Sequence, residues 1–239
     1  MTGWAARRFW KDVSVEAAEG GHRVRLDARP LMTPAKRPLI LPTLAVAEAV
    51  AGEWRAVGET VDPRQMPVTR SANAAIDKVA TQFAEVAGLI SDYGGTDLIC
   101  YRAETPEELT ARQAAAWDPL VDWAARRHGA ALTVTRGIVP VAQPAEGVAA
   151  LSRAVAALSP FELTALHDLV ALSGSLVIGL NATEPGSDPE ALWSLSRVDE
   201  DWQAELWGVD EEAAALAAVK KRDFLHAYRF WALLHDRAA

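Results

Sequence analysis

The chain has 239 residues, of which 50% are hydrophobic, and its formal net charge is −8 with a sequence pI near 5.2. This length and hydrophobic content support one large domain or two small domains with a real core, and they exclude a disordered chain. The acidic charge disfavours nucleic acid and anionic membranes, so we expect neither nucleic-acid binding nor membrane insertion. Cys100 is the only cysteine, which excludes an internal disulfide and indicates a reducing compartment.

Strand signals dominate up to about residue 43. The first 15 residues contain no apolar run of the signal-peptide kind, so we expect no targeting segment. Residues 22–26 alternate polar and apolar side chains, with Val24 and Leu26 on one face, which predicts a strand. Residues 27–29 then predict a hairpin turn, residues 30–33 the returning strand, and residues 39–41 a third strand.

Helical signals dominate the rest of the chain. Thr43 is an expected N-cap, followed by an apolar stripe of Val46, Ala49, Val50, Trp54 and Val57. Capping boxes at residues 105–108 and 159–162 predict two further helices, the second extending to about Leu180. Asp188 and Pro189 open a helix that Gly208 ends, and a last helix starts near Asp210. Residues 131–141 predict a strand weakly.

These elements predict an α+β fold in two parts. We expect a small β-rich N-terminal domain at residues 1–75 and a larger, mostly α-helical C-terminal domain at residues 76–239.

The most unusual segment is residues 199–212, which contains seven carboxylates, no basic residue and two tryptophans. On a helical wheel drawn for residues 189–207, Leu192, Leu195, Val198, Trp202 and Leu206 share the expected core face. A second face carries Trp193, Ser196, Glu200, Gln203 and Trp207. Tryptophan beside acidic and amide side chains is typical of a protein-binding hot spot. The alternative is a helix packed between two layers, with both faces buried.

Enzymatic signatures are weak. The five histidines lack metal-ligand spacing, and the chain contains neither a phosphate-binding loop nor a Gly-x-Ser-x-Gly elbow. We therefore expect no catalytic residue, no cofactor and no metal. Two alternatives stay open. One is a small-molecule enzyme that uses the Asp/Glu cluster near Glu200 and Glu205, which a pocket with shifted pKa values there would favour. The other is a permanent subunit of a complex.

Several ordered motifs resemble the F-type ATP synthase assembly chaperone family, of the alpha-proteobacterial and mitochondrial type. The matching segments are residues 26–34, 39–43, 53–54, 66–70, 72–77, 199–200, Gln203 and residues 207–213. The resemblance extends from about Arg8 to the last helix. Departures occur at Ala28, where the family usually has glycine, and at Arg55, Val57 and Ser71.

The resemblance implies a chaperone without ATPase activity that binds the unassembled α subunit of the F(1) sector until it joins β. Together with the wheel, it points to Glu200, Gln203, Trp207 and Glu211 as partner-binding residues, and it adds Trp54. Because Trp54 lies on the Val50–Val57 stripe, we expect it to support the core instead. The free protein is expected to be a monomer in the cytoplasm, or in the mitochondrial matrix if the source is eukaryotic.

Overall fold

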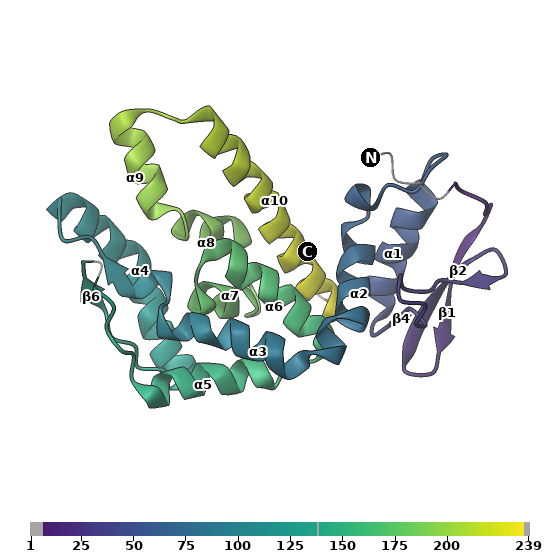
Figure 1. Cartoon of the computed structure of the whole chain (residues 1–239), viewed down its shortest axis with the longest axis horizontal. Helices are drawn as coiled ribbons and strands as arrows, with labels where there is room; N and C mark the ends of the chain where they lie inside the picture. Colours follow the sequence, from purple (N-terminus) through teal and green to yellow (C-terminus); the bar gives the residue numbers. More distant parts are fainter. Residues whose placement is uncertain (1–6, 138, 237–239) are drawn as a thin grey trace. The chain divides into compact units, whose positions relative to one another are not determined.

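The computed structural model describes residues 7–137 and 139–236 (Figure 1). The strands are β1 (Val13–Ala18), β2 (Gly21–Leu26), β3 (Arg29–Pro30), β4 (Ile40–Leu41), β5 (Tyr101–Arg102) and β6 (Thr135–Arg136). The first helices are α1 (Leu44–Ala56), α2 (Pro67–Asp77), α3 (Phe83–Asp92), α4 (Glu107–His128) and α5 (Ala145–Ala156). The later ones are α6 (Pro160–Ser173), α7 (Leu176–Ala182), α8 (Pro189–Leu195), α9 (Val198–Trp207) and α10 (Glu211–Leu234). The predicted α+β class is confirmed: an antiparallel N-terminal sheet with a helix precedes a largely helical remainder.

The described part of the chain divides into two compact units. Unit 1 comprises residues up to Phe83, Pro160–Ala165 and the residues from Arg229 onward, and unit 2 comprises Ala84–Ser159 and Leu166–Tyr228. Compactness does not test whether a segment folds alone, so the division after residue 75 stays a prediction. The first six residues of the stretch expected to lack a targeting segment lie outside the described residues.

In unit 1, β2 is the centre of the sheet. It pairs antiparallel with β1, with Leu26 opposite Val13 at one end and Gly21 opposite Ala18 at the other. Its other edge pairs with β3 and β4. Gly21 permits this arrangement, because a Cβ atom there would lie 2.2 Å from the Leu41 carbonyl oxygen. Strand β1 was not predicted, because its side chains are partly exposed on both faces and give a weak alternation signal. The returning strand is shorter than predicted, because β3 ends at Pro30.

The first helix packs its apolar stripe against this sheet. The Thr43 hydroxyl accepts a hydrogen bond from the Val46 backbone N–H at 3.2 Å, which confirms the predicted N-cap. Val46 and Val50 are fully buried, as are Val24 and Leu41 of the facing strands. Burying each such side chain contributes roughly 1.5–3 kcal/mol, so this layer stabilises unit 1.

In unit 2, one predicted helix start and one predicted helix length are wrong. Pro106, not Thr105, is the N-cap of α4, and no side chain caps it. The helix expected to reach Leu180 breaks at Gly174, where φ is +75°, and restarts as α7. Ser175 caps α7 by accepting a hydrogen bond from the Ile178 N–H at 3.0 Å. The weak strand predicted for residues 131–141 reduces to the two residues of β6, paired parallel with β5, and Ile138 lies outside the described residues.

A buried carboxylate joins two further segments of unit 2. Asp97 is fully buried and accepts hydrogen bonds from the Val177 N–H at 3.0 Å and the Ile99 N–H at 3.3 Å. Burial raises the pKa of Asp97 to about 6. The side chain thus satisfies the first orphan N–H groups of α7 from a position 80 residues earlier in the chain.

Candidate protein-binding site

The segment predicted as one helix over residues 189–207 consists of two helices. Asp188 opens α8 as predicted, since its carboxylate accepts hydrogen bonds from the backbone N–H groups of Glu190 and Ala191 at 3.0 and 3.2 Å. The helical pattern then ends at Leu195, and α9 begins at Val198. A single helical wheel drawn across this break assigns the wrong phase to one of the two helices. The two predicted faces are therefore wrong as continuous surfaces.

The break changes the environment of Trp193 and Leu206. Trp193 is only 5% exposed, and its ring lies 5.6 Å from that of Phe224. It therefore belongs to the core of unit 2 and not to the exposed face on which it was predicted. Leu206 was expected in the core but is 57% exposed. Each prediction failed because it extended the phase of one helix into the other.

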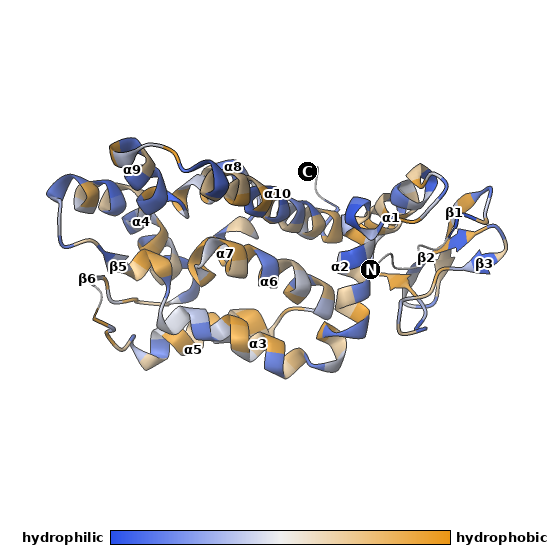
Figure 2. Ribbon diagram, turned by 45° about the horizontal axis from the view of Figure 1, so that its top comes forward, coloured by the Kyte–Doolittle hydropathy of each residue, from blue (hydrophilic) through white to orange (hydrophobic). Residues whose placement is uncertain are grey.

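Helix α9 lies beside α4 (Figure 2), and polar contacts join the two helices. The Trp117 indole N–H donates to the Leu195 carbonyl oxygen at 2.7 Å, just before the break. The Gln113 side-chain amide donates to Asp199 at 2.6 Å, and its carbonyl oxygen accepts from the Ala103 N–H at 2.7 Å. Because Gln113 and Trp117 are buried, these bonds determine where α9 starts.

Two carboxylates of α9 form partly exposed ion pairs with arginines. Arg112 on α4 contacts Glu205 at 2.7 Å, and Arg197 contacts Glu200 at 2.6 Å. The hydrogen bond from Arg112 lowers the pKa of Glu205. A general acid near neutral pH needs the opposite shift, so Glu205 is unsuited to the catalytic role considered above.

The remaining predicted residues are exposed along α9 and at the start of α10. Glu200, Gln203 and Trp207 recur at intervals of three and four residues and so lie on one side of α9. Trp207 is 78% exposed, the highest value among the large hydrophobic side chains of residues 7–137 and 139–236. Gly208 follows with φ at +89° and ends α9, as predicted. Glu211 then lies exposed in the first turn of α10.

Trp54 lies elsewhere, in unit 1. It is half-buried, and its ring centroid is 5.1 Å from that of Trp10, which is 3% exposed. This packing favours the expected structural role, and a partner contact for Trp54 stays a prediction.

The sequence motifs around Trp54 form internal bonds that the sequence analysis did not predict. The Glu53 carboxylate accepts hydrogen bonds from the backbone N–H groups of Val68 and Thr69 at 2.7 and 2.8 Å, and from the Thr69 hydroxyl at 2.7 Å. It therefore caps α2 from α1. Asp77, at the end of α2, accepts from the Thr33 hydroxyl at 2.7 Å. The sequence shows each of these carboxylates beside a half-apolar helix. It does not show which group the carboxylate binds, because that group lies at no fixed spacing along the chain.

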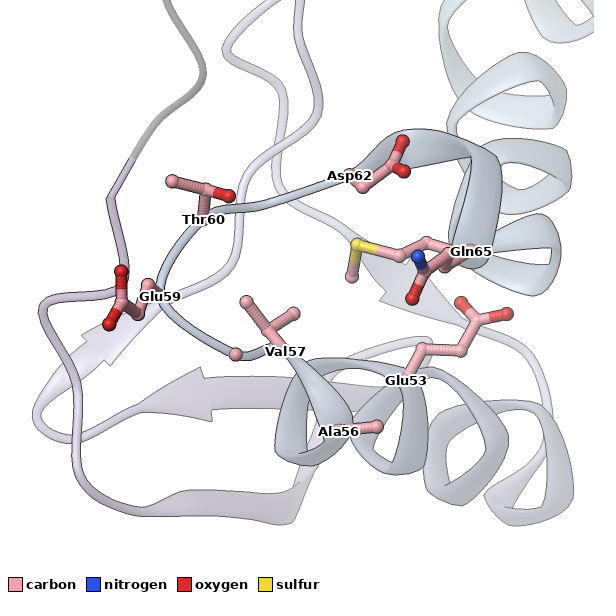
Figure 3. Close-up of a pocket in the computed structure, with 9 residues that line it drawn as sticks. Glu53, Ala56, Val57, Glu59, Thr60, Asp62 and Gln65 are labelled. Carbon is pink, nitrogen blue, oxygen red and sulfur yellow. The ribbon is translucent and has the colours of Figure 1, made fainter.

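A cavity of about 330 Å³ lies beside this cap (Figure 3). It is lined by the end of α1, the following loop and the short helical turn at Pro63–Gln65. Two of its carboxylates are already bound internally: Glu53 to α2, and Asp62 to Arg64 at 3.0 Å. Neither Glu200 nor Glu205 lines it. Within residues 7–137 and 139–236, no group of His, Cys, Asp or Glu side chains is arranged to hold a metal ion.

Among the helices described, none combines the length and the apolar character needed to cross a membrane.

Comparisons with known proteins agree with the motif resemblance. The family model described as ATP12 chaperone protein matches residues 7–125. "Protein atp12, mitochondrial" from Schizosaccharomyces pombe is 26% identical over 221 residues, covering 87% of this chain and 75% of that protein.

Solved structures show similarity over nearly the whole chain. Atp12 from Paracoccus denitrificans is 53% identical with a TM-score of 0.94, covering 96% of this chain and 98% of that one. The Atu1473 protein from Agrobacterium tumefaciens is 41% identical with a TM-score of 0.89, covering 94% and 85% respectively.

Proposed function

The chain belongs to the ATP12 chaperone family, and from this premise we propose that it binds the unassembled α subunit of the ATP synthase F(1) sector and prevents its aggregation until it joins β. The family is one of chaperones involved in ATP synthase assembly, so the protein is a chaperone and not an enzyme. The identity of the client subunit and the residues that contact it are the parts proposed here.

The observation that carries the proposal is the exposure of Trp207 beside carboxylates. A subunit awaiting assembly presents an apolar interface that aggregates when bare. A large exposed indole can enter such a surface, and it costs little conformational entropy because it has two rotatable bonds. Carboxylates next to it would attract basic side chains at the rim of the interface and speed encounter.

The site residues are proposed to divide this work. Trp207 would supply buried apolar area, while Glu200, Gln203 and Glu211 would supply charge and hydrogen bonding around it. A surface with one exposed aromatic anchor can bind reversibly, which a chaperone needs if β is to displace it. We further propose that the free protein is a monomer located in the cytoplasm, or in the mitochondrial matrix of a eukaryote.

Co-expression with the separate α and β subunits tests the client. We expect the chain to co-purify with α alone, to keep α soluble without nucleotide, and to leave the complex when β is added. Equal protection of an unrelated aggregating protein, or a requirement for ATP hydrolysis, would contradict the proposal.

A further inference from the structure

The connection between α9 and α10 (labelled in Figure 1) and the first half of α10 are largely exposed. Every residue from 205 to 216 is exposed. Residues 205–219 are called the α9–α10 corner below. Its five large apolar side chains are exposed by the following fractions: Leu206 57%, Trp207 78%, Val209 69%, Leu216 56% and Val219 43%.

The two halves of α10 differ in what covers them. Phe224 and Ala227, in the later part of the helix, are buried. Leu216 and Val219, three residues apart and therefore neighbours on the helix surface, remain exposed among alanines. Helix propensity by itself accounts for the alanines but not for Val219, because valine is a weaker helix former. An exposed pair of branched apolar side chains on a surface of small residues indicates a face that another chain covers.

Charge specifies the chemistry of that chain. Residues 198–219 contain seven carboxylates and no lysine or arginine. Glu200 and Glu205 pair with arginines, Asp199 binds Gln113, and Asp210 accepts from the Glu212 and Ala213 N–H groups at the start of α10. Asp201 lies near Arg112, whose pKa is raised chiefly by the hydrogen bond to Glu205 and also by the charge of Asp201. Within the described residues, Glu211 and Glu212 make no side-chain hydrogen bond or ion pair, so their charge is left for a partner.

We propose that the whole α9–α10 corner, with Leu216 and Val219 extending the Trp207 site, binds one apolar segment of the client that is flanked by lysine or arginine. This inference rests on the proposed function and specifies the kind of client segment recognised. The same charge argues against two other occupants. A second copy of this chain would bring like charges together, and an anionic membrane would repel the corner.

The test uses a charge-neutral double variant, Leu216→Gln with Val219→Gln, which removes apolar contact without changing the net charge. The matched control is Leu89→Gln, which alters an equally exposed leucine (58%) on α3. Circular dichroism and thermal unfolding establish that both variants fold. Binding is measured to purified α subunit and, independently of the client, to a synthetic amphipathic peptide of leucine and lysine, with a leucine–glutamate peptide as the charge control.

We expect the double variant to bind both the α subunit and the leucine–lysine peptide at least ten-fold more weakly than wild type, with Leu89→Gln unchanged and the leucine–glutamate peptide unbound. If the double variant binds α and the peptide like wild type, the corner inference is overturned while the client assignment stands. If wild type binds the leucine–lysine peptide through the corner but ignores α, the client assignment fails and the corner stands. Self-association or vesicle binding that the double variant abolishes would also overturn the inference.

Discussion

The carboxylates of unit 1 and those of the α9–α10 corner differ in what they bind, although both sets belong to the motifs that relate this chain to its family. Glu53 and Asp77 accept hydrogen bonds from residues of their own unit. Glu211 and Glu212, in the corner, make no such bonds within the described residues. The comparison teaches that a motif residue can serve the fold or the partner, and that its internal hydrogen bonds indicate which.

The tryptophans repeat this contrast. Trp54 packs against Trp10, and Trp193 packs against Phe224, whereas Trp207 is 78% exposed. Matched substitutions in the two regions therefore test this difference. Those in unit 1 should lower stability, and those in the corner should weaken binding.

The largest expected effect is that of Trp54→Ala. Removing a ring that packs on the buried Trp10 should lower the free energy of unfolding by about 3 kcal/mol, at the lower end of values for a buried aromatic because Trp54 is half-buried. Denaturant unfolding measures this, and any loss of client capture should follow the loss of folded protein. Unchanged stability with lost capture would move Trp54 into the binding site.

Glu53→Ala should destabilise unit 1 by about 2 kcal/mol, because it leaves the Val68 and Thr69 N–H groups at the start of α2 without their acceptor. The matched control is Glu59→Ala, which alters an exposed glutamate a few residues away. Thermal unfolding of both variants checks the difference. Equal melting temperatures would show that the cap contributes little and that the contrast between the two regions is overstated.

Trp207→Ala should change the free energy of unfolding by less than about 0.5 kcal/mol, because the ring is exposed. It should weaken capture of the α subunit by about 2 kcal/mol, mainly through faster dissociation, since it removes apolar area from the complex. Surface-based binding kinetics beside an unfolding curve separate these two quantities. A large fall in stability would place Trp207 with Trp54 and Trp193 instead.

The smallest effects are expected from the charge reversals Glu211→Lys and Glu200→Lys. Each should slow association with the client about three- to ten-fold at low salt, and the defect should shrink as salt rises and screens the charge. Glu146→Lys is the matched control, because Glu146 lies in the first turn of α5 as Glu211 lies in the first turn of α10. The same defect in all three variants would indicate a general effect of net charge. If neither Glu211→Lys nor Glu200→Lys slows association, the acidic face is solvated surface and does not contact the client.

Local features of the fold were predictable. Thr43, Asp188 and Gly208 mark helix ends where expected, because each of these three caps lies within one turn of the helix end that it marks. The strand at residues 22–26 was predicted because alternation reports one buried face. β1 was missed because its pairing with β2, and not its own pattern, makes it a strand.

The family, the acidic segment and the end of α9 at Gly208 could be read from the sequence, because motif order, composition and a glycine at a helix end need no knowledge of the packing. Only the tertiary structure decided which of these residues face solvent. Contacts from α4, 78 to 93 residues away from their partners, position α9 after its break, so Trp193 is buried while Leu206 and Trp207 are exposed. A helical wheel cannot supply this result, because the phase between two helices depends on what each packs against.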